Sequence, residues 1–222
     1  MEKILVLDFG GQYNQLIARR VRECNVYSEV LAYKTEIDKI RNGGYSGIII
    51  TGGPASVFDE DAPRCSKELF ELGIPVLGIC YGAHLMTYML GGTVSKAAIG
   101  EYGNVQLSID EADSLLYKSI PSSTQCWMSH ANSITDAPSG FKITAHTSDC
   151  KIASMENAAE KLYAVQYHPE VVHTPLGTNI LRNFIYNVCG CKGDWVIASF
   201  VEEKIEEIKQ KVMGKKVLCA LF

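Results

Sequence analysis

Apolar residues in the first eighty positions follow two alternating patterns. Short apolar runs, each suited to a buried strand, cover residues 4–7, 26–31, 48–50 and 74–79. Between them, residues 13–21 and 69–72 place apolar side chains at the three- and four-residue spacing of an amphipathic helix. Strands that alternate with helices are typical of a parallel sheet covered by helices on both faces. The sequence therefore predicts an α/β three-layer sandwich with a mostly parallel central sheet.

The pattern changes in the second half of the chain. Residues 93–166 contain shorter alternating segments, such as 142–146 and 151–155, separated by clusters of Pro, Gly, Ser and Asp. These segments predict a smaller mixed β region that closes over one end of the sheet. A further strand is expected at 162–167, followed by a helix at 178–188.

Residues 192–222 differ in character from the domain expected at residues 1–191. A charged helix with a thin apolar stripe is expected at 200–209 and should end near Gly214. A strand pattern then begins at 216–221. Because a single strand has no sheet of its own to join, we expect residues 192–222 to be a linker helix and the first strand of a further domain in a longer polypeptide.

Composition narrows the classes of partner. The 222 residues are 47% hydrophobic, which is enough for the core of one domain, and the net charge of −4 gives no general attraction for nucleic acid or an anionic membrane. No apolar stretch approaches the roughly 20 residues that cross a bilayer. Eight cysteines without an N-terminal secretion signal favour a reducing environment. We expect a cytoplasmic protein without nucleic-acid or membrane partners.

A glycine-flanked cysteine follows the apolar run at 74–79. Gly78, Cys80 and Gly82 form a Gly-x-Cys-x-Gly sequence directly before a helical pattern at 85–90. Such a sequence is typical of a nucleophile elbow, a tight strand-to-helix turn that presents its central side chain to a substrate. The start of the helix would favour a thiolate on Cys80. The alternative is a structural cysteine that packs like a small apolar side chain.

His168 and Glu170 supply a candidate base for this cysteine. His168 follows the strand expected at 162–167, and Pro169 restricts the backbone there to an extended or turning conformation. Parallel strands end at one edge of a sheet, so His168 should emerge beside the elbow. Glu170 could then orient the imidazole, giving a base that takes the thiol proton and later protonates a leaving group. Alone, His-Pro-Glu is an ordinary solvated turn; with Cys80 it predicts a Cys-His-Glu triad.

His84 has a different interpretation, since it lies four residues after Cys80 on the same helical pattern. The two could form a dyad or half of a metal site. However, a thiol at an elbow points away from its own helix, and no second Cys/His pair has metal-ligand spacing. Cys189 and Cys191 are separated by one residue and lack a partner pair. We therefore expect no metal site.

The segment 51–54, Thr-Gly-Gly-Pro, follows the strand expected at 48–50 and should lie beside the elbow. Glycine lets a backbone amide approach a reacting carbonyl, so we expect the N–H groups of Gly53 and Tyr81 to form an oxyanion hole. Loss of one such donor typically costs about 2.7–4 kcal/mol. A plain β-turn is the alternative. Gly10 and Gly11 could instead indicate a nucleotide-binding loop. However, the complete glycine motif of dinucleotide-binding domains is absent from the sequence.

Together these motifs resemble the class I glutamine amidotransferases, in which a Cys-His-Glu triad releases ammonia from glutamine. The segments 52–54, 78–82 and 168–170 occur in family order and span the domain. Within the family, the likeness is strongest to the amidotransferase domains of guanosine monophosphate (GMP) synthetases. Further residues that carry this likeness are 7–10, 12–13, 17–20, 101–103, 127–130, 168–174, 187–191 and Trp195.

This resemblance implies a flavodoxin-like fold and hydrolysis of L-glutamine through a thioester on Cys80, with no metal or organic cofactor. GMP synthetases continue into an ATP-pyrophosphatase (synthetase) domain, which uses ATP and Mg²⁺ to adenylate xanthosine monophosphate (XMP) before ammonia converts it to GMP. Residues 192–222 resemble the linking helix and first strand of that domain. The resemblance implies the synthetase domain as a partner, in the same or another polypeptide, and leaves a homodimer of the full-length enzyme open.

The resemblance also implies contacts with the substrate. They fall on Gly52, His84, Ser129, His130, Ala131 and Asn132. His84 stands where the family usually has glutamine, Ala131 and Asn132 stand where Gly-Asp is typical, and Gly11 replaces a common serine. These departures leave the triad intact and predict an altered affinity for glutamine. A packed structural histidine is the alternative for His130.

Two other functions stay open from the sequence. A glutaminase of another biosynthetic complex, or a γ-glutamyl hydrolase, would keep the fold and the triad. His173-Thr174 and the C-terminal helix and strand favour the likeness to GMP synthetases over these. A degenerate domain that binds glutamine or senses redox state through Cys80 would show slow thiol chemistry without turnover.

Overall fold

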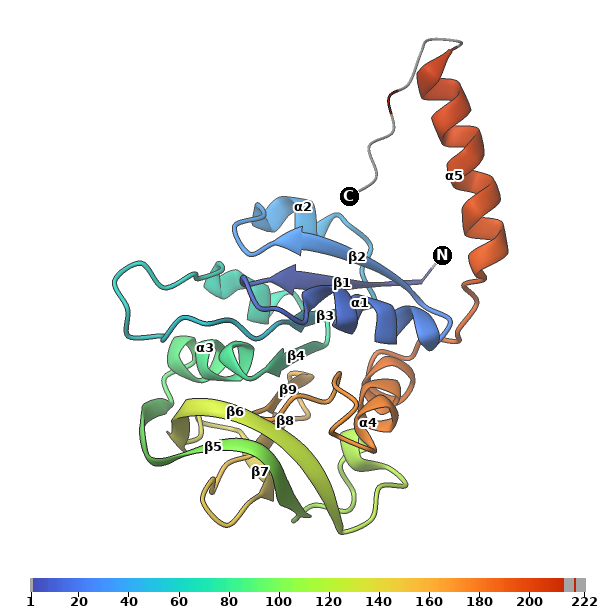
Figure 1. Ribbon diagram of the computed structural model, residues 1–222. Coiled ribbons are helices and arrows are strands. Elements are labelled where there is room, and N and C mark those ends of the chain that lie inside the picture. Colours follow the sequence, from blue (N-terminus) through green and yellow to red (C-terminus); the bar gives the residue numbers. More distant parts are fainter. Residues whose placement is uncertain (1, 214–217, 219–222) are drawn as a thin grey trace.

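The computed structural model describes residues 2–213 and residue 218, and the strands of this part form one mixed sheet (Figure 1). The nine strands in the described residues are β1 (Lys3–Asp8), β2 (Tyr27–Ala32), β3 (Gly47–Ile50), β4 (Val76–Ile79), β5 (Thr93–Ile109), β6 (Ser123–Asp136), β7 (Lys142–His146), β8 (Ser154–Asn157) and β9 (Leu162–Val165). Their order is β2-β1-β3-β4-β9-β8-β7-β5-β6. Neighbours from β2 to β9 run parallel, and all later pairs are antiparallel.

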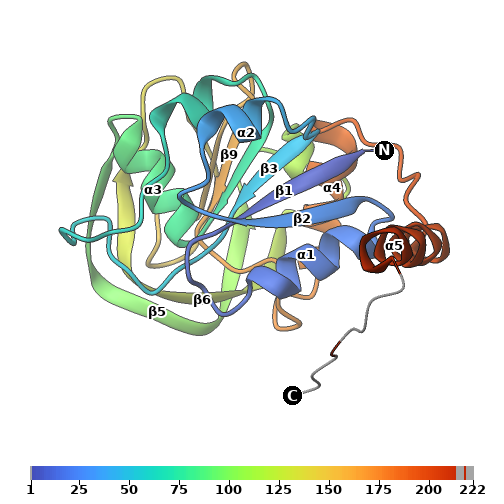
Figure 2. The same cartoon turned by 90° about the horizontal axis from the view of Figure 1, so that it is seen from above.

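Helices cover both faces of the parallel half (Figure 2). One face carries α1 (Asn14–Glu23) and α4 (Gly177–Asn183), and the other carries α2 (Ile37–Arg41), the 3₁₀ helix η1 (Lys67–Glu71) and α3 (Tyr81–Met89). The side chains of β1 alternate between two apolar cores, with Ile4 and Val6 facing α1 and Leu5 and Leu7 facing α3. The predicted α/β three-layer sandwich is confirmed.

The mixed region is more regular than the sequence pattern predicts. Its first strands, β5 and β6, are 17 and 14 residues long and form one antiparallel hairpin instead of several short segments. A bulge shifts their register between Lys96 and Glu101, which breaks the simple alternation along β5. Residues 129–132, predicted to contact the substrate, are part of β6. The region also continues the main sheet, because β8 pairs directly with β9.

Three element boundaries differ from the sequence predictions. The helical pattern at 69–72 forms only the five-residue η1. The strand expected at 151–155 begins later, at Ser154, because Thr147 Oγ1 accepts hydrogen bonds from the backbone N–H groups of Asp149 and Cys150 and holds a turn there. The helix expected at 178–188 changes from α4 into the π-helix η3 (Phe184–Val188).

The charged helix predicted near the C-terminus is present and longer than expected. This helix, α5 (Ile197–Val212), projects from the body of the molecule (Figure 1). Its apolar stripe is exposed, since Val201, Ile205 and Ile208 keep about half of their surface accessible. The strand predicted at 216–221 lies outside the described residues, apart from residue 218.

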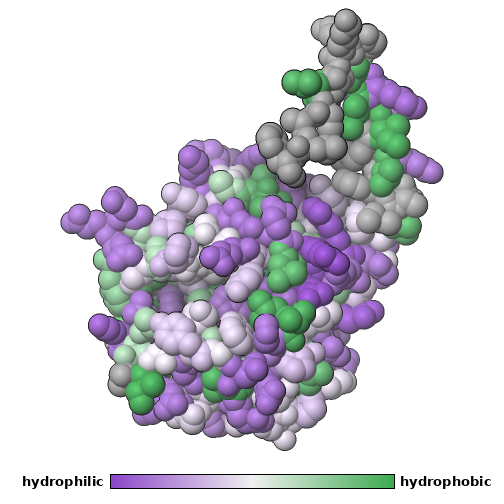
Figure 3. All heavy atoms as spheres, in the orientation of Figure 1, coloured by the Kyte–Doolittle hydropathy of each residue, from purple (hydrophilic) through white to green (hydrophobic). Residues whose placement is uncertain are grey.

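The face of the molecule drawn in Figure 3 is mostly hydrophilic, with separate hydrophobic spots on the body and a longer apolar line along α5. Among the described residues, no helix combines the length and the apolar character needed to span a membrane.

Candidate active site

Cys80 occupies a strained turn between β4 and α3. Its φ of 52° lies in the left-handed region, which residues with a side chain rarely adopt. All four residues of β4 are buried, so the strand cannot shift to relax this turn. The turn is also tightly packed, because a Cβ atom on Gly82 would lie 2.5 Å from the carbonyl oxygen of Ile50. Cys80 has the elbow geometry expected from the Gly-x-Cys-x-Gly sequence.

His168 and Glu170 form a buried pair at the end of β9. His168 Nδ1 lies 2.7 Å from Glu170 Oε1. The backbone holds His168 in place, because its N–H donates to the Trp127 carbonyl at 3.0 Å and its carbonyl accepts from Thr174 Oγ1 at 2.6 Å. With Nδ1 engaged by the carboxylate, Nε2 is the ring nitrogen available to Cys80.

The charge state of His168 follows from these contacts. Burial lowers the pKa of His168, but hydrogen bonds to Cys80 and Glu170, together with their negative charge, outweigh it and raise the pKa to about 10. The imidazole is therefore protonated at neutral pH. A protonated imidazole in this position can deliver its proton to a leaving group.

Two residues of the α1 side support the pair, and the sequence patterns did not single them out. Arg20 Nε donates to the Glu170 carbonyl at 3.0 Å. The Tyr13 ring packs edge-on against the His168 imidazole, with centroids 5.5 Å apart. Because Arg20 and Glu170 are 150 positions apart, no local spacing could have predicted the contact. The only signal was their place in the segments that carry the family likeness.

The glycine segment predicted to supply part of the oxyanion hole lies beside the elbow. Strand β3 pairs with β4, so the segment 51–54 begins beside Cys80. A Cβ atom on Gly52 would lie 3.3 Å from His168 Cε1 and 3.6 Å from Cys80 Cβ. A Cβ atom on Gly53 would lie 2.7 Å from the Phe9 carbonyl oxygen, so only glycine fits there without movement. The roles of the Gly53 and Tyr81 N–H groups stay predictions.

Two cavities meet at Cys80, and together they include every residue predicted for the site. The first, which we call the β1–α1 cavity, is lined by Gly10, Gly11, Gln12, Tyr13, Asn14, Thr51, Gly52, Gly53, Pro54, Cys80, Ser129, His168 and Glu170. The second, which we call the β6 cavity, is lined by Gly53, Pro54, Ala55, Ser56, Cys80, Tyr81, His84, Tyr102, Ser129, His130, Ala131 and Asn132. The structure thus brings the triad and the predicted substrate residues together.

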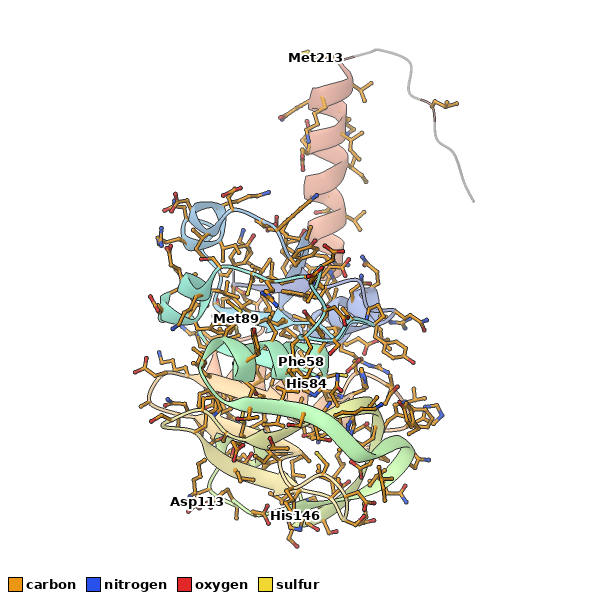
Figure 4. All side chains as sticks on the ribbon, turned by 90° about the vertical axis from the view of Figure 1, so that its left-hand side faces the viewer. Phe58, His84, Met89, Asp113, His146 and Met213 are labelled. Carbon is orange, nitrogen blue, oxygen red and sulfur yellow. The ribbon has the colours of Figure 1, made fainter. Side chains whose placement is uncertain are left out.

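His84 does not pair with the thiol. It lies on α3 (Figure 4), and its Nε2 donates to Gln166 Oε1 at 2.6 Å. Burial lowers the pKa of His84 to about 4, although the hydrogen bond to Gln166 acts in the opposite direction. His84 is therefore neutral at physiological pH. It lines the β6 cavity with a polar side chain that carries no charge.

His130 has structural contacts as well as a place on the β6 cavity. Its Nε2 lies 3.2 Å from Glu101 Oε2 and its Nδ1 lies 2.8 Å from the Asn132 carbonyl, while Thr147 Oγ1 donates to Glu101 Oε1 at 2.7 Å. Ligand atoms of Glu101, His130 and Cys150 lie within 4.8 Å of one another, a grouping that sequence spacing did not reveal. These donors could approach a cation, but the hydrogen bonds already satisfy Glu101 and His130. The expected absence of a metal stays a prediction.

The fold and this geometry define a class of protein. An α/β sandwich that presents a cysteine on a strained elbow, opposite a histidine oriented by a carboxylate, has the architecture of a cysteine hydrolase. The family is more specific: the family model for class-I glutamine amidotransferases matches residues 5–188, and the chain belongs to this family.

Curated relatives and solved structures agree with this membership. The chain is 60% identical over 220 residues to the GMP synthase [glutamine-hydrolyzing] of Acetivibrio thermocellus, and 56% identical over 218 residues to that of Clostridium botulinum. These alignments cover 99% and 98% of this chain. They cover only 43% and 42% of the relatives, so the chain spans less than half of their length.

Two solved structures share the fold. A candidate GMP synthase subunit from Thermoplasma acidophilum superposes with a TM-score of 0.77 at 28% identity, covering 92% of this chain and 98% of its own. A glutamine amidotransferase from Thermotoga maritima superposes with a TM-score of 0.70, covering 85% of this chain and 98% of its own. At 16% identity, the second likeness concerns the fold alone.

Proposed function

We propose that this chain hydrolyses L-glutamine to glutamate and ammonia, with Cys80 as nucleophile, His168 as acid and base, and Glu170 as the group that orients His168. The observation that carries the proposal is the buried His168–Glu170 pair beside a cysteine on a strained elbow. Membership of the class-I glutamine amidotransferase family supports glutamine as the substrate.

The reaction proceeds in two halves. The Cys80 thiolate attacks the side-chain amide carbon, and the N–H groups of Gly53 and Tyr81 stabilise the resulting oxyanion. His168 protonates the amide nitrogen as the C–N bond breaks, which releases ammonia and leaves a γ-glutamyl thioester. Water then gives a proton to His168 and its oxygen to the thioester carbon, so that glutamate leaves and the thiolate returns. Neither half requires a metal or an organic cofactor.

The full-length protein is proposed to be a GMP synthetase. The high identity to proteins named GMP synthase [glutamine-hydrolyzing], and the larger part of their length that this chain does not cover, support a synthetase domain as partner. That domain would use ATP and Mg²⁺ to activate XMP, and the ammonia made here would convert it to GMP. We assign residues 1–191 to the glutaminase and 192–222 to the connection with the synthetase domain, in a cytoplasmic enzyme.

Glutamate formation from L-glutamine tests the proposal. The unmodified chain is expected to produce glutamate and ammonia in equal amounts, and Cys80→Ala to abolish both products because the nucleophile is lost. The matched control is Cys65→Ala, which removes a half-buried thiol away from both cavities and should leave the rate unchanged. Turnover that survives Cys80→Ala, or no turnover by the unmodified chain, would contradict the proposal.

A further inference from the structure

Strand β6 contacts both reactive groups of the triad, although the sheet does not pair it with β9. Strands β8, β7 and β5 stand between β9 and β6 in the sheet. The carbonyl of Ser129 on β6 nevertheless faces the Cys80 thiol, with the oxygen and the sulfur 3.8 Å apart. Two residues earlier on the same strand, the Trp127 carbonyl accepts a hydrogen bond from the His168 N–H at 3.0 Å. The position of β6 therefore bears on the distance between His168 and Cys80.

The hydroxyl of Thr174 completes the connection between β6 and His168. Its Oγ1 accepts a hydrogen bond from the Trp127 N–H at 3.0 Å and donates one to the His168 carbonyl at 2.6 Å. Together with the direct bond from the His168 N–H, these contacts engage the N–H and the carbonyl of both residues. Trp127 and His168 are thus paired like opposite residues of two strands, with a hydroxyl inserted into one of their two hydrogen bonds.

The surroundings of Thr174 require a hydroxyl at this position. A hydroxyl can accept one hydrogen bond and donate another at the same time. Thr174 is only 3% exposed, and its own backbone is fixed, since its N–H donates to the Val171 carbonyl at 3.1 Å and its carbonyl accepts from the Gly177 N–H at 2.9 Å. An apolar side chain here would leave a buried N–H and a buried carbonyl without partners, which is costly. Movement of the His168 backbone would relieve that cost.

We infer that Thr174 is a positioning residue whose hydroxyl fixes the His168 backbone against β6 and thereby sets the approach of the imidazole to the Cys80 thiol. The inference rests on the proposed glutaminase function, because it gives Thr174 a part in the same reaction. Thr174 lines neither of the two cavities that meet at Cys80, so it acts only through His168. Loss of the hydroxyl should therefore slow the chemical steps more than it weakens the binding of glutamine.

Substitutions of the hydroxyl separate positioning from folding. Thr174→Val keeps the shape of the side chain and removes both hydrogen bonds, Thr174→Ser keeps the hydroxyl, and Thr174→Ala replaces Thr174→Val if the latter does not fold. Thr144→Val is the matched control, because Thr144 is also buried and its Oγ1 donates to Ser154 Oγ at 2.8 Å, outside both cavities. Glutamate formation gives kcat and KM, and urea unfolding gives the stability of each variant.

Thr174→Val and Thr174→Ala should lower kcat about tenfold or more while KM stays within about threefold. Thr174→Ser should keep kcat within about threefold of the unmodified protein. Thr144→Val should lose stability but keep its kcat. An unchanged kcat in Thr174→Val or Thr174→Ala, or an equal loss of kcat in Thr144→Val, would overturn the positioning role while the glutaminase function stands.

The pKa of His168 gives a second readout that needs no turnover. Contacts with Cys80 and Glu170 raise this pKa to about 10. An imidazole displaced from these partners should titrate at lower pH in Thr174→Val than in the unmodified protein, while Thr144→Val should leave the titration unchanged. NMR of the imidazole measures it, with the signal assigned from its loss in His168→Gln. The same pKa in all variants would overturn the positioning role, whereas no hydrolysis by the unmodified chain would contradict the proposed function itself.

Discussion

Glu170 fixes both the orientation and the charge of His168. The 2.7 Å contact occupies Nδ1, and the carboxylate is one of the two groups that raise the pKa of His168 to about 10. An acid with this pKa stays protonated through the neutral range and can deliver its proton to departing ammonia. We therefore expect Glu170 to act on the reaction through His168.

Glu170→Gln should lower kcat/KM for glutamine by about 10²-fold or more, since it disturbs the proton transfer. The pH profile gives a sharper readout. In the unmodified protein kcat/KM should fall as the pH rises through the pKa of His168, near 10. Removing the carboxylate charge lowers that pKa, so the alkaline limb should move to lower pH. An alkaline limb at the same pH in both proteins would refute this role of Glu170.

The lowered pKa of His84 predicts that the stability of the folded protein also depends on pH. Its pKa in the folded protein, about 4, lies below the ordinary value of 6.5. As the pH falls below 6.5 the unfolded chain binds the proton first, so stability decreases toward pH 4. Between pH 7 and pH 5 this residue should account for about 2 kcal/mol of the loss in unfolding free energy.

Urea unfolding of the unmodified protein and of His84→Gln at both pH values measures this contribution. His168 does not contribute to this difference between pH 7 and pH 5. Its raised pKa adds stability that is fully present below pH 6.5 and is lost only as the pH rises toward 10. The same drop in stability for both proteins between pH 7 and pH 5 would show that His84 is not buried in the neutral form.

Among the elements, α4 supports the triad through a contact that only glycine allows. A Cβ atom on Gly177 would lie 1.9 Å from the carbonyl oxygen of Pro169, the residue between His168 and Glu170. The methyl group of Gly177→Ala must displace the backbone between His168 and Glu170. We therefore expect a loss of about 1–3 kcal/mol in unfolding free energy and a lower kcat. Thr178→Ala, on the exposed side of α4, should change stability by less than about 0.5 kcal/mol. Equal behaviour of the two variants would contradict the packing argument.

The parallel strands could be predicted because four of them are continuous apolar runs and the fifth, β2, is interrupted only by Ser28 and Glu29, while the β5–β6 hairpin could not. The bulge shifts the register of β5 between Lys96 and Glu101, so the alternation by which strands are recognised is not continuous along β5. The features of the site likewise fall into two groups, those that the local sequence predicts and those that it does not. Local spacing predicted where Cys80, His168 and Glu170 lie, whereas the contacts of Arg20 with the Glu170 carbonyl and of His84 with Gln166 join distant segments and depend on the complete fold.

At the scale of the whole molecule, glutamine hydrolysis and nucleotide amination are proposed to occur in separate domains. The glutaminase chemistry is expected to need only residues of this chain, which is 43% of the length of its Acetivibrio relative. In the full-length protein, Cys80→Ala should therefore abolish GMP formation from glutamine but retain it when ammonium salts replace glutamine. Measurement of GMP from XMP and ATP with each nitrogen source decides this, and loss of both activities would contradict the division of tasks.

The most direct test of the glutaminase site is peptide mass spectrometry after treatment with a chloroketone analogue of glutamine, with and without competing L-glutamine. Burial raises the pKa of Cys65, Cys126 and Cys150 to about 12, so these thiols should stay protonated and unreactive. The predicted result is a single adduct on Cys80 that L-glutamine suppresses. An adduct on Cys80 that glutamine does not suppress, or no adduct there at all, would contradict the account.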